Sequence, residues 1–214
     1  MSLSKVLAEK KAATVKAVPA EVLAIMEAST NALIEDALSA KAIQTGSKLP
    51  SFELPDINNK STSLESFKNK FLVISFYRGG WCPYCNMELQ ALQGILPELE
   101  KLDAELVAIS PETPDNSLTT SEKNKISFPV LSDLNNTYAK SLGLAFKMPK
   151  DLCELYSGSF NIHVDAHNGN EDFELPMPAT YIVNEQREII YSFTPEDYTE
   201  RLDPEVVLKV LKEQ

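Results

Sequence analysis

The hydrophobic positions of this chain follow two patterns that alternate over most of its length. Uninterrupted apolar runs predict buried strands at 71–77, 105–110, 128–131, 180–184 and 188–193. Apolar residues at helical spacing predict helices at 83–100, near 114–125, near 134–142 and from Pro204 onward. Strands that alternate with helices are typical of a mostly parallel sheet covered by helices. We therefore expect an α/β fold from about residue 50 onward.

Local signals refine this expectation. Pro97 lacks a backbone donor, so it should kink or end the helix at 83–100. The last two strands are separated only by residues 185–187, which is short enough for an antiparallel hairpin. No regular pattern stands out in residues 151–175, which we expect to be irregular.

The first 45 residues have a different character from the rest. They predict helices interrupted at Val18 and Pro19, with apolar residues gathered on one face. Such a face must pack either on its own domain or on a second subunit of a homodimer, and the sequence does not decide between these two alternatives. We divide the chain into a helical extension, 1–45, and a main domain, 46–214.

Composition narrows the classes of protein to consider. The chain has 214 residues, 43% of them hydrophobic, and a formal net charge of −11, which disfavours nucleic acid and anionic membranes as partners. The charged N-terminus does not look like a signal peptide, and no apolar run approaches the length of a membrane span. Three cysteines suit a reducing compartment. We expect a cytoplasmic protein.

Cys82 and Cys85 lie where the strand at 71–77 gives way to a helix, after a Gly79-Gly80 turn. At a helix start the free amide groups and the helix dipole favour negative charge, which lowers the pKa of a thiol. Pro83 suits the first helical position, so Cys82 should be the N-cap. The two thiols are close enough in sequence to form a disulfide, and we interpret the pair as a redox centre.

Two other readings of the pair are weaker. A zinc site needs four ligands, and the remaining candidates, Cys153, His163 and His167, lie far along the chain without paired spacing. Two small buried hydrophobic residues would not explain the glycine turn, Trp81 and Pro83.

The string RGGWCPYC after a strand resembles the thioredoxin superfamily, and in particular its peroxiredoxin-like members of the alkyl hydroperoxide reductase/thiol-specific antioxidant group. Further stretches carry the same resemblance, at 46–56 (GSKLPSFELPD), 107–111 (VAISP), 128–133 (FPVLSD), 178–183 (PATYIV) and 197–201 (DYTER). The resemblance covers about residues 46–212. It implies a thioredoxin-like fold in which a strand and a helix are inserted between the two halves.

The site departs from a standard peroxiredoxin in three places. Aligned on Cys85, the usual threonine is replaced by Cys82 and the usual proline by Arg78. The later arginine is replaced by Pro178, which resembles the cis-proline of thioredoxins. The chain therefore combines a peroxiredoxin framework with thioredoxin-type features at the site.

Other residues have weaker signals. Trp81 should form a wall of the site, and Arg78 could stabilise a Cys85 thiolate. We expect Arg201 to form an ion pair at the surface rather than to reach this pocket. Cys153 is expected to be a small buried residue rather than a resolving cysteine, and neither histidine has an evident partner.

The resemblance implies a thiol-dependent peroxidase that reduces hydrogen peroxide or organic hydroperoxides. In this reading Cys85 attacks the peroxide and becomes a sulfenic acid, and Cys82 condenses with it to form a disulfide. Thioredoxin or a glutaredoxin-like protein would reduce that disulfide, and no cofactor or metal is needed. The alternatives are a disulfide oxidoreductase in which Cys82 attacks first, and a non-enzymatic redox-sensing protein.

Overall fold

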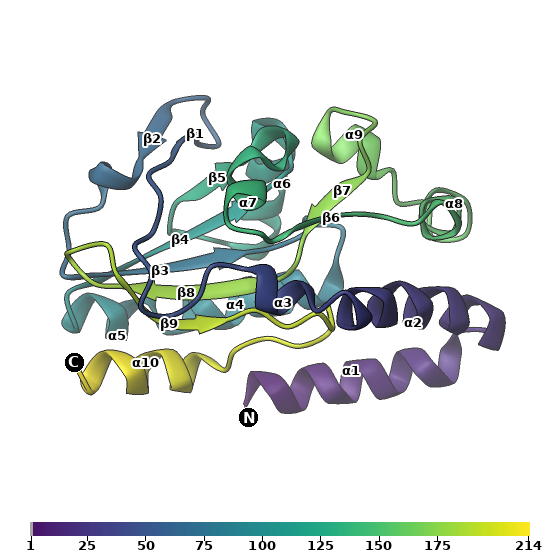
Figure 1. Cartoon of the computed structure of the whole chain (residues 1–214), viewed down its shortest axis with the longest axis horizontal. Coiled ribbons are helices and arrows are strands. Elements are labelled where there is room, and N and C mark those ends of the chain that lie inside the picture. Colours follow the sequence, from purple (N-terminus) through teal and green to yellow (C-terminus); the bar gives the residue numbers. More distant parts are fainter. Residues whose placement is uncertain (1) are drawn as a thin grey trace.

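The computed structural model describes residues 2–214, and a five-stranded sheet lies at its centre (Figure 1). The order of the strands is β5-β4-β3-β8-β9. Strands β3 (Phe71–Phe76), β4 (Ala104–Ser110) and β5 (Val130–Ser132) are parallel. Strand β8 (Ala179–Val183) runs antiparallel to β3, and β9 (Ile189–Phe193) runs antiparallel to β8 and so has the same direction as β3. The predicted C-terminal hairpin is confirmed, and the thioredoxin-like sheet has the α/β class that the sequence pattern predicts.

Strand β3 occupies the middle of the sheet because its whole run of side chains is apolar enough to be buried on both faces. All six of its residues are buried. Leu72, Ile74 and Phe76 point into one hydrophobic cluster, and Phe71 and Val73 point into the other.

Helices cover the two faces unequally. One face packs against α4 (Pro83–Gly94), α5 (Leu96–Lys101) and α10 (Pro204–Lys212). The other is covered by α7 (Thr137–Ser141) and by the segment that contains β1 (Glu53–Pro55), β2 (Ser61–Ser63) and the 3-10 turn η1 (Leu64–Ser66). Helix α6 (Pro114–Asn124) packs beside β5 and α4, and a second 3-10 turn, η2 (Leu134–Asn136), precedes α7.

The predicted break of the helix at 83–100 is confirmed. Helix α4 ends at Gly94, and Ile95 has non-helical backbone angles. Pro97 lies in the first turn of α5, where a backbone N–H group would have no acceptor within the helix, so a proline is tolerated there.

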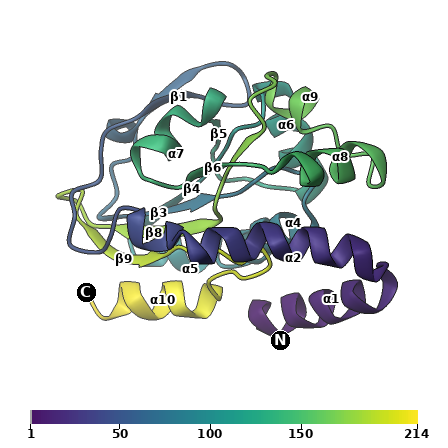
Figure 2. The ribbon, with the colours of Figure 1, turned by 45° about the vertical axis from the view of Figure 1, so that its right-hand side comes forward.

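The N-terminal helices α1 (Leu3–Ala17) and α2 (Ala20–Glu35) are separated at Val18 and Pro19, as predicted, and α3 (Leu38–Lys41) follows. Helix α1 contacts α4 through buried Leu3 and Leu7, and its Ser4 hydroxyl donates a 2.5 Å hydrogen bond to Asp203. In both views α1 and α2 run as a hairpin along one side of the sheet (Figures 1 and 2). The extension thus packs on its own chain; division at residue 45 and a homodimer remain predictions.

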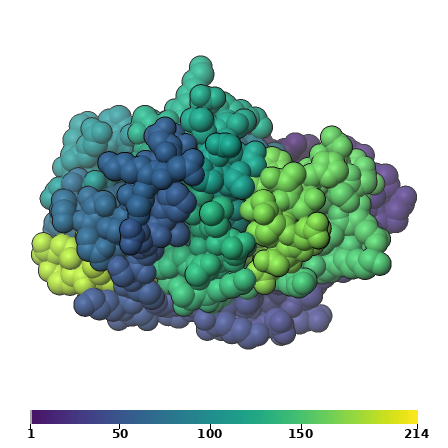
Figure 3. Space-filling model, turned by 90° about the horizontal axis from the view of Figure 1, so that it is seen from above, coloured from purple at the N-terminus to yellow at the C-terminus, as the bar shows by residue number. Residues whose placement is uncertain are grey.

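The expectation that residues 151–175 are irregular is wrong. They contain most of α8 (Lys150–Gly158), the short α9 (Val164–Asn168) and β7 (Glu174–Pro176), which pairs antiparallel with β6 (Ala145–Lys147). Helix α8 is anchored by three buried residues, Leu152, Leu155 and Tyr156. Their spacing is helical, but the helix is too short for this pattern to be distinctive in the sequence. This green segment forms one end of the molecule (Figure 3), and α8 contacts α2.

Within the described residues 2–214, none of the helices has both the length and the apolar character required to cross a bilayer.

Candidate active site

The redox pair lies where the central strand meets helix α4. Cys82 is the N-cap of α4 and Pro83 is its first residue, so both predictions about the start of this helix are confirmed. Cys85 lies in the first turn. The strand that carries the site is fully buried, so the motif is held by the most constrained part of the sheet.

The glycine turn before the cysteines is required by close contacts. Gly79 has φ +154°, and a Cβ placed on it would come within 2.3 Å of Trp81 Nε1. A Cβ on Gly80 would come within 1.9 Å of Thr120 Oγ1 on α6. Side chains larger than hydrogen would therefore push Trp81 and the cysteine loop away from their positions.

Both sulfur atoms are shielded from solvent. Cys82 and Cys85 are each 0% exposed and belong to the hydrophobic cluster between α4 and the sheet. Both carry free thiols in this structure, so the disulfide between them stays a prediction.

Arg78 contacts Cys82 rather than Cys85, which the sequence had suggested as its partner. Its Nη2 donates a 3.4 Å hydrogen bond to Cys82 Sγ, and its Nη1 donates to the Tyr156 hydroxyl at 3.2 Å. The guanidinium also stacks on Tyr198, 4.2 Å from the ring centroid. Only 4% of Arg78 is exposed, and no carboxylate pairs with it among the described residues. Its positive charge therefore faces Cys82 without compensation.

Arg201 is the second arginine of the site, and the expectation that it forms a surface ion pair is wrong. It is buried, and its Nη2 donates a 3.1 Å hydrogen bond to Cys85 Sγ. Its Nε pairs with the buried carboxylate of Glu88, and its Nη1 donates to the Tyr198 carbonyl at 2.7 Å. Arg201 therefore gives Cys85 a hydrogen-bond donor, and the carboxylate of Glu88 offsets part of its charge.

Burial, the hydrogen bond between the two thiols and the nearby arginine charges together shift the two pKa values in opposite directions. Burial opposes ionisation of Cys82, but a hydrogen bond from Cys85 and the charges of Arg78 and Arg201 lower its pKa well below the usual value. Burial, the hydrogen bond to Cys82 and the charge on Cys82 raise the pKa of Cys85 well above its usual value. The first proton lost by this coupled pair therefore leaves a thiolate at Cys82 and a thiol at Cys85.

Aromatic rings enclose the arginine side of the site. Trp81 packs edge-on against Tyr156, with ring centroids 5.5 Å apart, and the Arg78 guanidinium lies 5.0 Å from the Trp81 ring. Tyr84, in the middle of the cysteine motif, packs edge-on against Tyr198 at 5.7 Å. Trp81 therefore packs on Arg78 and Tyr156, and its role as a wall of the site stays a prediction.

Pro178 also lies at the site, but its expected cis geometry is wrong. The described residues contain no cis peptide bond. Pro178 joins β7 to β8 in an extended connection, which a trans X-Pro bond accommodates, and it lines a small cavity together with Arg78 and Tyr156.

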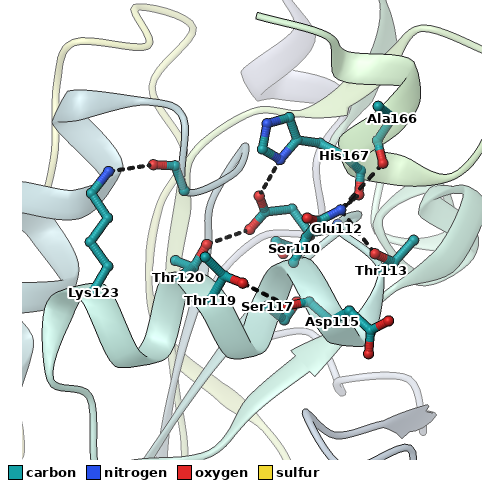
Figure 4. Close-up of polar contacts among 12 residues, drawn as sticks. Ser110, Glu112, Thr113, Asp115, Ser117, Thr119, Thr120, Lys123, Ala166 and His167 are labelled. Atoms are coloured by element: carbon teal, nitrogen blue, oxygen red, sulfur yellow. Dashed lines mark hydrogen bonds and ion pairs between the residues drawn. The ribbon is translucent and has the colours of Figure 1, made fainter.

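A further polar group lies behind the glycine turn, and the sequence reading missed it. Glu112 is 0% exposed; its carboxylate accepts a 3.0 Å hydrogen bond from Thr120 and lies 3.1 Å from His167 Nδ1 (Figure 4). The expectation that His167 has no partner is therefore wrong. Glu112 follows the strand at 105–110, whose carboxyl end meets that of β3, so its place in the sequence was a usable signal.

Cys153 lies on α8, half-buried, and its thiol faces the Met148 carbonyl at 3.9 Å. Burial raises its pKa, which disfavours the reactive thiolate. Within residues 2–214 no three His, Cys, Asp or Glu side chains gather as metal ligands would.

Comparison with known proteins agrees with this geometry. Residues 45–192 match the AhpC/TSA family. Chloroplastic peroxiredoxin Q of Populus jackii is 32% identical over 119 residues, which are 56% of this chain and 54% of that protein. This chain thus spans about half the length of that relative.

Two solved structures share the fold. Peroxidoxin BcpB of Mycobacterium tuberculosis superposes with a TM-score of 0.62 at 19% identity, covering 80% of this chain and 97% of that one. A bacterioferritin comigratory protein of Xanthomonas campestris, described with an alkyl peroxide reduction activity, superposes with a TM-score of 0.56 at 16% identity, covering 76% and 90%. Because the match to the AhpC/TSA family covers more than half of its residues, this chain belongs to that family, and it has the thioredoxin-like fold of the peroxiredoxins.

Proposed function

We propose that this protein is a thiol peroxidase that reduces hydroperoxides with Cys82 and Cys85. The observation that carries the proposal is the pair of buried sulfurs, of which one faces an arginine without a countercharge. Membership of the AhpC/TSA family supports the same activity.

The resemblance to standard peroxiredoxins assigns the attack to Cys85, but the charges favour Cys82. A thiolate is the nucleophilic form of cysteine, and Arg78 together with the Cys85 thiol stabilises it on Cys82. The Cys82 thiolate attacks one peroxide oxygen, the O–O bond breaks, and the alkoxide takes a proton and leaves as an alcohol, or as water from hydrogen peroxide. Cys82 is then a sulfenic acid.

Cys85 is placed to complete the oxidation. Its sulfur attacks the sulfenic sulfur, water leaves, and a Cys82–Cys85 disulfide forms. An external dithiol then reduces this disulfide by exchange and becomes a disulfide itself. Because Cys85 is one helical turn from Cys82, it can intercept the sulfenic acid before a second peroxide does.

The alternative, a protein disulfide oxidoreductase, uses the same two residues. Its substrate would have to bring a protein disulfide to a sulfur that is 0% exposed, whereas a hydroperoxide is small enough to enter a narrow site. Burial therefore favours a hydroperoxide as the oxidant; the external dithiol that reduces the disulfide must still reach one of these sulfurs. We further propose that the reductant is a thioredoxin- or glutaredoxin-like protein, that the chain forms a homodimer, and that it acts in the cytoplasm.

The proposed activity is tested by turnover and by mass spectrometry. With a dithiol reductant the protein should consume tert-butyl hydroperoxide catalytically. After one equivalent of peroxide without reductant, it should contain one Cys82–Cys85 disulfide and a free thiol at Cys153. No peroxide consumption, or a disulfide that includes Cys153, would contradict the proposal.

The role of Arg78 predicts a change in pH dependence. In wild type the rate of peroxide consumption should rise as the Cys82 thiol ionises and level off above the lowered pKa of Cys82. Arg78→Gln removes the facing charge, so the pKa of Cys82 rises and the rate profile shifts to higher pH. Most of the lost rate at neutral pH should return in alkaline buffer. Arg187→Gln, which changes an arginine that binds the Phe67 carbonyl, is the control and should keep the wild-type profile. An unshifted profile for Arg78→Gln would show that this charge does not set the reactivity.

A further inference from the structure

The guanidinium of Arg78 is held in place by few hydrogen bonds. Among the described residues it has two acceptors: Nη2 donates to Cys82 Sγ at 3.4 Å, and Nη1 donates to the Tyr156 hydroxyl at 3.2 Å. Its Nε has no partner there. Tyr198 and Trp81 pack on the guanidinium without accepting a hydrogen bond from it. Apart from the reactive sulfur, the Tyr156 hydroxyl is thus the one acceptor that orients Arg78 within the described part of the chain.

This hydroxyl constrains the motion that matters for Cys82. A guanidinium is rigid and planar, so fixing one of its nitrogens constrains the directions of the others. Stacking on Tyr198 limits its tilt but leaves it free to rotate within its own plane. The hydrogen bond from Nη1 to Tyr156 opposes this rotation and keeps Nη2 directed at Cys82 Sγ.

Tyr156 is itself held through both its ring and its backbone. It lies on helix α8 and is 4% exposed. Its ring packs edge-on against Trp81 and lies 6.0 Å from the ring of Phe160, and its carbonyl accepts a 2.8 Å hydrogen bond from the Ile162 N–H. An acceptor that is fixed in this way sets the direction of the Arg78 donor and does not follow its movement.

The helix after α8 attaches this part of the chain to the main domain at a second point. In α9 the ring of His167 lies 3.1 Å from the Glu112 carboxylate (Figure 4). The His167 carbonyl accepts hydrogen bonds from the Thr113 N–H and from the Asn116 amide, each at 3.0 Å. Helix α8 also contacts α2. Contacts at α8 and at α9 thus keep Tyr156 against the redox loop.

We propose that Tyr156 is a positioning residue whose hydroxyl aims the guanidinium of Arg78 at Cys82. The two residues lie 78 positions apart, so the α8–α9 segment belongs to the active site although it lies far from the redox motif in the sequence. This inference rests on the proposed function, in which Cys82 is the nucleophile, and adds the residue that directs its arginine.

Tyr156→Phe tests the hydrogen bond, because it removes the hydroxyl and keeps the ring that packs on Trp81. Without this acceptor the charge of Arg78 faces Cys82 for less of the time, so the pKa of Cys82 should rise. Iodoacetamide alkylation of Cys82, followed against pH in a Cys85→Ser background, measures this change. We expect the profile to move to higher pH and the rate at neutral pH to fall by roughly threefold to tenfold, about the effect of one hydrogen bond.

Tyr138→Phe, in the same background, is the matched control. Tyr138 is also a buried tyrosine whose hydroxyl makes one hydrogen bond, to the Pro50 carbonyl at 2.8 Å, and it lies in the other hydrophobic cluster. Its alkylation profile should equal that of the parent protein.

A double-mutant cycle distinguishes positioning from packing. In an Arg78→Gln background Tyr156→Phe should cause no further shift, because the hydroxyl then has no cation to direct. A residue that only supports the fold would shift the profile equally in both backgrounds. An equal shift, an unshifted profile, or a shift to lower pH would each contradict the positioning role.

The outcomes for Tyr156 and for the proposed function can be told apart. An unchanged alkylation profile in a protein that consumes peroxide would overturn the positioning role and leave the peroxidase standing. A profile that Tyr156→Phe shifts only when Arg78 is present, in a protein that consumes no peroxide, would support the positioning role and overturn the peroxidase.

Discussion

Cys82→Ser should lose peroxide consumption almost completely, whereas Cys85→Ser should still consume one equivalent of peroxide and stop at a sulfenic acid. The expected fall for Cys82→Ser is on the order of a thousandfold or more, because the nucleophile itself is removed. The physical reason is that the hydrogen bond from Cys85 and the charge of Arg78, which no carboxylate pairs, stabilise a thiolate on Cys82, whereas Cys85 keeps its proton.

Stopped-flow mixing with peroxide, followed by dimedone trapping and mass spectrometry, measures both results. Cys153→Ser serves as the control and should behave as wild type, since the Cys153 thiol on α8 faces the Met148 carbonyl. Rapid consumption by Cys82→Ser, with dimedone on Cys85, would restore the assignment that the resemblance to standard peroxiredoxins implies. The hydrogen bond from Cys85 and the charge of Arg78 would then not decide which sulfur reacts.

Glu88→Ala should destabilise the fold by about 3–5 kcal/mol, because it leaves the Arg201 guanidinium buried without its carboxylate. For a chain of this size that corresponds to a fall in melting temperature of roughly 10 °C. Differential scanning calorimetry measures it. Glu100→Ala, at an exposed position on α5, is the control and should change the melting temperature little.

Glu88→Gln separates the electrostatic role from the packing role. It keeps the side-chain volume but removes the charge, so Arg201 faces Cys85 uncompensated and the pKa of Cys85 should fall. Alkylation of Cys85 by iodoacetamide in a Cys82→Ser background, followed against pH, reports this pKa. A stability near that of wild type in Glu88→Ala, and an unchanged Cys85 profile in Glu88→Gln, would mean that the ion pair contributes little.

The parts of this site that depend on neighbouring residues could be predicted from the sequence. The start of α4 at Pro83, with Cys82 as its cap, follows from local rules about proline and free amide groups. The strand before it follows from an unbroken apolar run. Family resemblance then accounts for the order of the sheet.

The parts of the site that depend on distant residues could not be predicted from the sequence. Arg201 reaches Cys85 across 116 positions, and only the packing of the segment before α10 on α4 brings them together. A charged residue in a sequence indicates a surface position by default, and burial becomes evident only when Glu88 appears beside it. The contact between Glu112 and His167 could not be predicted for the same reason: the two residues lie 55 positions apart, and α9 is too short to have a periodic signal.

The uncompensated charge of Arg78 also has a thermodynamic consequence for the proposed disulfide. In the reduced protein this buried cation faces a thiolate, and the two charges stabilise each other. Oxidation to a disulfide removes the negative charge and leaves the guanidinium buried opposite a neutral sulfur, which is unfavourable. The reduced state is thereby favoured, as it is in strongly oxidising dithiol proteins. A thiol donor should therefore reduce the Cys82–Cys85 disulfide readily. Each catalytic cycle then returns to the reduced form, which can react with peroxide again.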